Sequence, residues 1–333
     1  MIARIWSRTK EAFARWFRRA PAPGRFESGS KSSFHGWVTT APIVWPSRDY
    51  LVYVPKGRSQ WKRAPLLVLC HGCRQTPEEF AQGTRVVDLA DRTGCVVLLP
   101  RQKDTANPWR CWNWFEQRTM HGKGEAAIVA AQIRRVRRLY RIDRKRVLVA
   151  GMSAGGALAA IMGVRYPGLV SAVAVHSGLA CGAASSTMTA IGVMQRGPDR
   201  DVAQVGSDAR ARAPGNVRVP LLAIHGERDP VVTPRNAEAL VAQYLRLNGC
   251  TEAPDHASPA LPAADVEQHA TLSDGRTETI REWRRDGQLV VRHVEVGGLG
   301  HAWSGGDTSL PYNEAGPPDA TALVGGFFAD AVS

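Results

Sequence analysis

The sequence has few cysteines and no long apolar run. Six cysteines in 333 residues are too few for a disulfide framework, so reduced thiols are expected. No apolar run reaches the roughly 20 residues that a transmembrane helix requires. The first residues also lack the apolar segment and small-residue cleavage site of a secretory signal. A cytoplasmic chain is therefore expected.

Acidic residues are scarce as well. There are 30 of them against 43 lysines and arginines, which gives a formal net charge of +13. Residues 1–31 hold eight basic and two acidic residues, and a second basic cluster spans residues 134–146. The second cluster alternates with apolar residues at helical spacing, which indicates a solvated helix face. Neither cluster forms a recognisable nucleic-acid-binding motif, so no specific nucleic-acid binding is expected.

The beginning of the chain divides into two segments. Residues 1–19 are predicted to form a basic amphipathic helix, because apolar side chains recur at helical spacing over residues 2–19 with arginines opposite. Such a helix suits an anionic membrane surface, but it also suits packing on this protein's own core or on a partner. Residues 20–36, rich in proline, glycine and serine, are expected to be a flexible linker. The catalytic domain is expected to span residues 37–333.

Strands and helices alternate through that domain. Strands are expected at residues 50–54, 66–69, 95–99, 147–150, 172–175, 221–224 and 290–296, and helices at 77–92, 123–140, about 154–164 and 319–331. Continuous apolar strands between helices indicate an α/β fold with a mostly parallel central sheet and helices on both faces. Residues 177–218 are expected to form a small lid-like insertion or pocket wall, and residues 251–276 a surface insertion.

A serine in a tight turn is the main chemical signal. The sequence Gly151-Met152-Ser153-Ala154-Gly155 follows an apolar strand and precedes a helix of small residues. A G-x-S-x-G turn in that context exposes the serine hydroxyl, and its glycines allow neighbouring backbone to approach closely. Ser153 is therefore predicted to be a nucleophile. The alternative is an ordinary Gly-Ser loop.

A carboxylate and an imidazole follow in the order that sheet-based hydrolases use. Asp229 comes after the strand at 221–224, where an acid can orient a histidine. Glu227 is its rival, and a turn or capping role is the alternative for Asp229. His301 lies in a glycine-bracketed loop after the last strand and is predicted to be general base and then general acid. His71, His176 and His225 also end strands, but their order fits this role less well.

Backbone donors for an oxyanion are expected at two places. One is the N–H of Ala154, and the other lies in the loop His71-Gly72-Cys73-Arg74-Gln75. Cys70 and Cys73 formally make a C-x-x-C pair, but no thioredoxin-like helix follows them. The side chains interpreted as substrate-binding walls, with core packing as the alternative, are four tryptophans in loops on the same side: Trp109, Trp112, Trp114 and Trp303.

Together these segments resemble the poly(3-hydroxyalkanoate) depolymerase-like esterases, a branch of the α/β-hydrolases. The resemblance covers most of residues 37–331. It rests on the serine turn and on four further segments: His71-Gly72-Cys73-Arg74-Gln75, Cys111-Trp112-Asn113-Trp114-Phe115, Asp229-Pro230-Val231-Val232 and Gly300-His301-Ala302-Trp303.

The resemblance implies ester hydrolysis through an acyl-serine intermediate, without a metal or an organic cofactor. It implies that Ser153, Asp229 and His301 form a catalytic triad and that Cys73 and Ala154 form the oxyanion hole. It also makes Cys73 and Cys111 a candidate disulfide, provided the protein meets an oxidising compartment.

The substrate expected from the resemblance is a polyhydroxyalkanoate or its oligomers. Residues 2–19 would then place the enzyme on a polyester granule or the inner membrane surface. A carbohydrate ester hydrolase of the acetyl xylan or feruloyl esterase type is the alternative within the same class. A surface-binding protein that works through the N-terminal helix is the alternative from another class.

Overall fold

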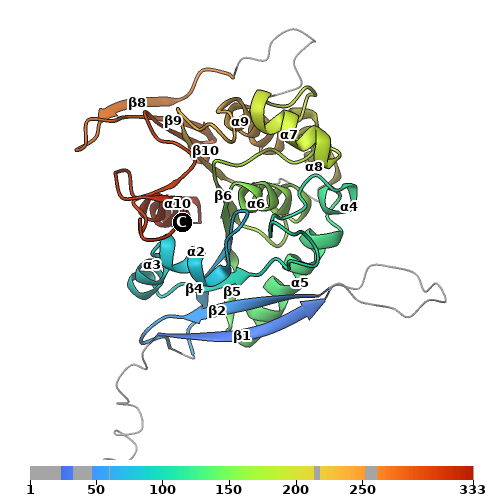
Figure 1. Cartoon of the computed structure of the whole chain (residues 1–333), viewed down its shortest axis with the longest axis vertical. Coiled ribbons are helices and arrows are strands. Elements are labelled where there is room, and N and C mark those ends of the chain that lie inside the picture. Colours follow the sequence, from blue (N-terminus) through green and yellow to red (C-terminus); the bar gives the residue numbers. More distant parts are fainter. Residues whose placement is uncertain (1–23, 33–46, 60, 214–217, 252–260, 333) are drawn as a thin grey trace, which may run out of the picture.

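The computed structural model describes residues 24–32, 47–59, 61–213, 218–251 and 261–332 (Figure 1). The helix predicted over residues 2–19 lies outside the described residues. The strands are β1 Arg25–Ser32, β2 Ser47–Val54, β3 Ala64–Cys70, β4 Val96–Pro100, β5 Ile142–Met152, β6 Ala172–His176, β7 Leu221–Gly226, β8 Val266–Thr271, β9 Thr277–Arg285, β10 Gln288–Val296, β11 Trp303–Ser304 and β12 Asn313–Glu314. The helices are α2 Pro77–Gly83, α3 Val86–Thr93, α4 Gln117–Met120, α5 Gly124–Leu139, α6 Ala154–Arg165, α7 Thr187–Arg196, α8 Ala203–Arg212, α9 Arg235–Leu247 and α10 Ala320–Ala331.

Ten of the described strands form one sheet in the order β1-β2-β4-β3-β5-β6-β7-β10-β9-β8. The six central strands, from β4 to β10, run parallel to one another, whereas the two strands at either edge are antiparallel to their neighbours. The parallel strands are buried on both faces, which is why they read as continuous apolar runs in the sequence. The predicted α/β-hydrolase architecture, with its mostly parallel sheet, is confirmed.

Two apolar clusters cover the two faces of the sheet. One contains the inward faces of α5, α6 and α9, and the other contains those of α2, α3 and α10. Figure 1 shows α3 and α10 on one side of the sheet and α5 and α6 on the other. Because the central strands share one direction, the loops that follow them gather at one edge of the sheet, here called the carboxyl edge.

The predicted linker is wrong where the structure describes it. Residues 25–32 form β1, which pairs antiparallel with β2, so the folded domain begins before residue 37. Its glycine and serine content suggested a linker, but the backbone needs a small residue there. A Cβ on Gly29 would lie 2.5 Å from the ring of Tyr50. Phe26 also packs on Tyr53, with ring centroids 5.0 Å apart.

The helix predicted at residues 77–92 is two helices. Arg85 takes a left-handed conformation (φ 55°) between α2 and α3. The break follows from contacts with the distant C-terminal part of the chain. The Asp307 N–H donates to the Gly83 carbonyl at 2.9 Å, and the Thr321 hydroxyl donates to the Thr84 carbonyl. These contacts hold the backbone at the end of α2 and override the helical periodicity.

The two predicted insertions have different structures. The segment from 177 to 218, predicted to be a lid-like insertion or pocket wall, carries α7 and α8. Helix α7 contacts the loop after β7, where the Thr233 N–H donates to the Met194 carbonyl at 2.8 Å. The segment predicted as a surface insertion at 251–276 instead contributes β8 to the sheet. β8 pairs with β9, and its polar, exposed side chains carry no apolar alternation that would have predicted a strand.

Candidate active site

Ser153 lies at the carboxyl edge, between the end of β5 and the start of α6. Its backbone is at φ 55° and ψ −121°, an unfavourable region for a residue with a side chain. Flanking glycines make this turn possible. A Cβ on Gly155 would lie 2.1 Å from the Cys70 carbonyl oxygen, and one on Gly151 would lie 2.4 Å from the Gly155 carbonyl oxygen. The end of β3 therefore packs directly against the serine turn.

Asp229 and His301 are hydrogen-bonded. The Nδ1 of His301 lies 2.7 Å from Oδ2 of Asp229, and the Asp229 side chain is fully buried. The loops that carry them are tightly packed, because a Cβ on Gly226 would lie 2.3 Å from the Leu299 carbonyl oxygen. Since a carboxylate only accepts, Nδ1 carries the proton and Nε2 of neutral His301 is left as a proton acceptor.

The surroundings of Asp229 favour its ionised form. Burial raises its pKa, but the hydrogen bond and charge of His301, the Val232 N–H and the nearby His225 outweigh that effect and leave the pKa below its usual value. The second oxygen, Oδ1, accepts from the N–H groups of Val231 at 2.9 Å and Val232 at 2.8 Å. The carboxylate is therefore held in place by its own loop as well as by His301.

The rival acid lies elsewhere. Glu227 is exposed, and its carboxylate accepts from the Gly298 N–H at 3.4 Å instead of from an imidazole. Asp229, two residues further on, is the acid that reaches His301.

His176 connects the serine turn to the acid–imidazole pair. It ends β6, the strand between those that lead to Ser153 and Asp229, and its carbonyl accepts from the Ser153 N–H at 2.9 Å. Burial lowers the pKa of its imidazole to about 3. The nearby His225 and His301 also lower it, whereas Asp229 raises it. His176 is thus a buried neutral neighbour of both parts of the site.

The other histidines at strand ends are buried and engaged structurally. His225 Nε2 donates to the Val232 carbonyl at 2.8 Å and lies 3.5 Å from Asp229 Oδ2. His71 Nδ1 donates to the Gly72 carbonyl at 2.8 Å, while its Nε2 accepts from the Gln102 N–H at 3.1 Å. His293, within β10, is also buried, and both of its ring nitrogens lack a partner among the described residues.

The loop after β3 lies beside the serine. A Cβ on Gly72 would lie 3.7 Å from the Cβ of Ser153. The backbone N–H of Cys73, the next residue, finds no acceptor within the described part of the chain. Ala154 is the first residue of α6, so its N–H has no partner inside the helix. The structure therefore leaves free N–H groups at both predicted oxyanion positions.

Cys73 and Cys111 form a disulfide. This corrects the expectation of reduced thiols at these two positions and matches the pair that the family resemblance implied. It also settles the C-x-x-C alternative, because Cys70 is a free thiol at the buried end of β3.

Three of the four tryptophans interpreted as substrate-binding walls belong to the core. Trp112, Trp114 and Trp303 are at most 4 % exposed. Trp112 donates its indole N–H to the His71 carbonyl at 3.0 Å, and Trp303 stacks on His176 with ring centroids 5.1 Å apart. Trp112 and Trp303 therefore pack against the histidines that follow β3 and end β6. Trp109, in contrast, is 58 % exposed, and the Arg74 guanidinium lies 4.3 Å from its ring centroid.

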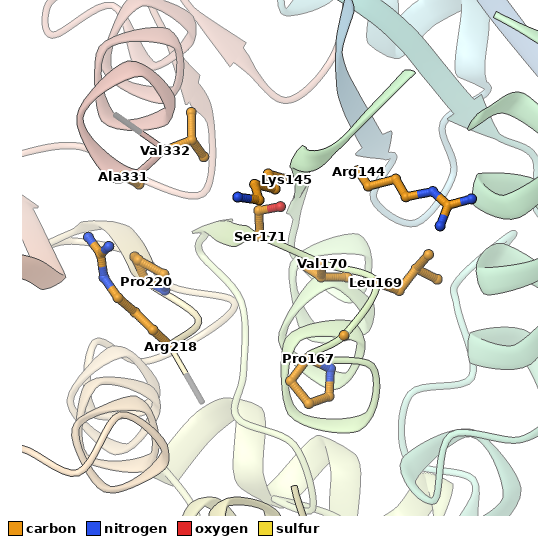
Figure 2. Close-up of a pocket in the computed structure, with 11 residues that line it drawn as sticks. Arg144, Lys145, Pro167, Leu169, Val170, Ser171, Arg218, Pro220, Ala331 and Val332 are labelled. Atoms are coloured by element: carbon orange, nitrogen blue, oxygen red, sulfur yellow. The ribbon is translucent and has the colours of Figure 1, made fainter. Parts of the chain in front are cut away.

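Two cavities lie away from Ser153. One, of about 310 Å³, is at the opposite edge of the sheet, where β5, β6 and β7 begin. Figure 2 shows Lys145 and Ser171 in its middle, with Arg218 and Arg144 to either side. The other, of about 400 Å³, is lined by His225, His293 and Trp283 among others. His225, in turn, lies 3.5 Å from Asp229 Oδ2.

The described residues contain no group of three or more histidine, cysteine, aspartate or glutamate side chains that could hold a metal ion. Within those same residues, every helix is too short or too polar to cross a membrane.

A buried polar network was missed by the sequence reasoning. Glu125 and Arg48 form an ion pair at 3.0 Å, with both side chains less than a tenth exposed. Apart from Gln132, the other buried residues of the helix that carries Glu125 are apolar, so a carboxylate on that face was the available signal. Gln102 and Asn113 complete the network.

Comparison with known proteins finds a family. Residues 48–261, more than half of the chain, match the family model described as esterase PHB depolymerase. The chain is 32% identical over 207 residues to poly(3-hydroxyalkanoate) depolymerase C of Paucimonas lemoignei, a match that covers 61% of this chain and 49% of that protein. It is 31% identical over 206 residues to feruloyl esterase B of Neurospora crassa, covering 59% and 69%. The chain thus spans about half the length of the Paucimonas protein.

A solved structure supports the fold. The acetyl xylan esterase from Aspergillus awamori superimposes with a TM-score of 0.63 at 20% identity, over 76% of this chain and 89% of that one.

Proposed function

The chain belongs to the esterase PHB depolymerase family, and on that premise we propose that it is a serine esterase that works through an acyl-serine intermediate. Ser153 is the proposed nucleophile, His301 the base and Asp229 the acid that orients it. The observation that carries the proposal is the 2.7 Å hydrogen bond between His301 and Asp229, at the same sheet edge as the strained turn of Ser153.

The proposed first half-reaction forms the acyl-enzyme. His301 Nε2 takes the proton of the Ser153 hydroxyl while the oxygen attacks the ester carbonyl carbon. The Cys73 and Ala154 N–H groups then stabilise the negative carbonyl oxygen of the tetrahedral intermediate. When the intermediate collapses, the bond to the alcohol oxygen breaks and the imidazolium returns its proton to that oxygen. The alcohol leaves, and the acyl group stays on Ser153.

Hydrolysis of the acyl-enzyme repeats these steps with water. His301 removes a proton from water as the water oxygen attacks the acyl carbon, and the Ser153 oxygen leaves and regains a proton from the imidazolium. The ionised Asp229 stabilises the imidazolium in both halves. Its lowered pKa supports this role, because the carboxylate then keeps its charge at neutral pH.

The proposed substrate is a polyhydroxyalkanoate of the polyhydroxybutyrate type, or its oligomers. Exposed apolar side chains on segments that follow the carboxyl ends of strands support this choice. They are Trp109 after β4, Met188 and Ile191 on α7 after β6, and Val231 after β7. An aliphatic polyester is apolar between its ester groups, so exposed apolar side chains on these segments favour its contact.

A carbohydrate ester hydrolase is the second candidate. The names of several relatives describe feruloyl and acetylxylan esterases. The exposed ring of Trp109 also favours it, because an aromatic face can stack on a sugar or a feruloyl ring. The two candidates share the same proposed chemistry at Ser153 and differ in what surrounds the scissile ester.

The location of the enzyme is a further part of the proposal. Residues 2–19, with their apolar face and arginines, are proposed to hold it at a polyester granule or an inner membrane surface. Deleting residues 1–20 should release the protein from granules and leave turnover of a soluble ester unchanged. If residues 1–36 alone bind granules and function survives the loss of Ser153, the chain is a surface-binding protein instead.

One substrate panel tests the activity and separates the candidates. The wild type and Ser153→Ala are assayed on p-nitrophenyl butyrate, hydroxybutyrate trimer, acetyl xylan and a feruloyl ester. The wild type should turn over p-nitrophenyl butyrate, and Ser153→Ala should lose at least about 10³-fold in kcat because the variant lacks the proposed nucleophile. A higher kcat/KM on the trimer supports the polyester substrate, and a higher value on acetyl xylan or the feruloyl ester overturns it. Undiminished turnover by Ser153→Ala overturns the esterase mechanism.

A further inference from the structure

A buried polar network contacts the loop His71–Gln75. It consists of Arg48, Gln102, Asn113 and Glu125. All four side chains belong to residues less than a tenth exposed. They come from β2, the segment after β4, and α5, so three parts of the fold meet at this point. A buried ion pair costs desolvation that its own attraction rarely exceeds, so stability alone is a weak reason for such a network.

Glu125 is the centre of the network. Its Oε1 accepts from Arg48 Nη2 at 3.0 Å, Gln102 Nε2 at 2.5 Å and Asn113 Nδ2 at 3.2 Å. Its Oε2 accepts from the Asn113 backbone N–H at 2.7 Å. One carboxylate thus fixes a side chain from β2, a side chain from the segment after β4, and the backbone beside Trp112.

The network reaches the loop His71–Gln75 at three points. The Gln102 N–H donates to His71 Nε2 at 3.1 Å, and the Trp112 indole donates to the His71 carbonyl at 3.0 Å. The third point is covalent, because Cys111 is bonded to Cys73 and its carbonyl accepts from Gln102 Nε2 at 2.9 Å. The residues on both sides of Gly72 are therefore anchored to groups that Glu125 holds.

His71 is suited to this arrangement. Its Nε2 accepts a hydrogen bond only while the ring is neutral, and burial lowers the pKa of the imidazole to about 4. The anchor from Gln102 therefore persists at neutral pH.

We infer that Glu125 is a positioning residue for the Cys73 backbone N–H, the proposed oxyanion donor, and acts on it through Gln102, Asn113, Trp112 and the Cys73–Cys111 disulfide. The inference rests on the proposed serine esterase mechanism. A donor aimed at a developing oxyanion loses much of its effect when it moves by a fraction of an ångström. Loosening the network should therefore slow acyl transfer and leave binding of the ester substrate nearly unchanged.

The test compares Glu125→Gln with a matched control. Glu282→Gln removes another buried carboxylate, on β9 near the far edge of the sheet. The Glu282 carboxylate accepts from Arg292 and from Arg284, each at 2.7 Å. For each variant, urea unfolding gives the loss of stability. The kcat and KM for p-nitrophenyl butyrate are then measured under conditions where the protein is folded, together with the inhibition constant of a trifluoromethyl ketone, whose adduct carries an oxyanion.

Glu125→Gln should lower kcat by about 10- to 100-fold, keep KM within about twofold, and weaken the trifluoromethyl ketone by a similar factor to kcat. Glu282→Gln should lose stability and keep kcat and the inhibition constant within about twofold of wild type. Glu125→Asp, which keeps the charge, should recover part of the kcat. The inference is wrong if Glu125→Gln keeps wild-type kcat, or if the two Gln variants lose activity alike.

A second variant covers a failure of Glu125→Gln to fold. Trp112→Phe keeps an aromatic ring but removes the indole N–H that holds the His71 carbonyl and part of the ring that packs on His71, and it should lower kcat several-fold with unchanged KM. Wild-type kcat in Trp112→Phe would overturn the inference in that case. Ser153→Ala distinguishes a failure of the proposed mechanism from a failure of the positioning role alone. Full turnover by Ser153→Ala removes the proposed mechanism itself, whereas its loss together with wild-type kcat in the network variants removes only the positioning role.

Discussion

The His301 imidazole donates to the Asp229 carboxylate at 2.7 Å, although 72 residues separate the two in the chain. The contact exists because β7 and β10 are parallel neighbours, so the loops that follow them leave the sheet side by side. Two further interactions hold the loops together. The Glu227 N–H donates to the Val296 carbonyl, and the Arg228 N–H donates to the Leu299 carbonyl.

Asp229→Asn should reduce kcat on p-nitrophenyl butyrate by about 10³- to 10⁴-fold without unfolding the protein. The amide keeps the shape but removes the charge that stabilises an imidazolium, and it favours the wrong tautomer of His301. Glu227→Gln is the matched control, since Glu227 is exposed and its carboxylate accepts from the Gly298 N–H at 3.4 Å instead of from an imidazole. Equal losses in the two variants would contradict the assignment of the acid.

Trp303→Phe should lower the free energy of unfolding by about 1–3 kcal/mol and leave KM unchanged. The variant loses the hydrogen bond from the indole N–H to the Thr321 hydroxyl, a buried contact of 3.0 Å, and part of the stacking on His176. Urea unfolding and steady-state kinetics measure both quantities. A raised KM with unchanged stability would restore the prediction that Trp303 is a substrate-binding wall.

Trp109→Ala should show the opposite pattern. Its ring is exposed and contacts the Arg74 guanidinium, so its removal should change the free energy of unfolding by less than about 0.5 kcal/mol. The KM for hydroxybutyrate trimer should rise several-fold, because the ring is proposed to contact the substrate. An unchanged KM on both the trimer and a feruloyl ester would exclude Trp109 from substrate binding.

Gly155→Ala should destabilise the protein by about 3 kcal/mol or more, because the new Cβ would lie 2.1 Å from the Cys70 carbonyl oxygen, and backbone cannot move aside cheaply. Gly326→Ala is the control. Gly326 is exposed in α10, and a Cβ added there would enter open space, so alanine should stabilise the helix by about 0.5–1 kcal/mol. Equal thermal midpoints for the two variants would refute the close approach at the serine turn.

Stability should fall as the pH drops below about 6.5. Burial lowers the pKa of His71 to about 4 and those of His176 and His293 to about 3 in the folded protein. The unfolded chain therefore takes up protons first, and each histidine can remove up to about 1.4 kcal/mol per pH unit between its unfolded and folded pKa. His293→Leu should flatten the profile between pH 6 and 4, whereas His269→Gln, at an exposed residue, should not. Parallel profiles would contradict the buried neutral state of His293.

The sequence predicted those parts of the fold that depend on local pattern. The parallel strands are buried on both faces, so their apolar runs identified them, and the order Ser153, Asp229, His301 followed from the loops after three of them. The order also indicated which aspartate and histidine would meet. Local sequence pattern was therefore enough to predict the central strands and the candidate site residues.

What the sequence did not predict depends on distant contacts. β1 looked like a linker because Gly29 and its serines suit one, but the small residue is needed under Tyr50. From the sequence, the tryptophans near the site could line a substrate pocket or belong to the core. The contacts of Trp303 with His176 and of Trp112 with His71 place these two in the core. The charges of Arg48 and Glu125, 77 residues apart, gave no sign that they would meet inside the protein.

The central claim is that Ser153 is a nucleophile activated by His301, and covalent labelling with a fluorophosphonate tests it most directly. Peptide mass spectrometry of the labelled wild type should find one adduct, on Ser153, and His301→Ala should react at least about 10³-fold more slowly. An adduct on another serine, or labelling of Ser153 at the same rate in His301→Ala, would contradict the account.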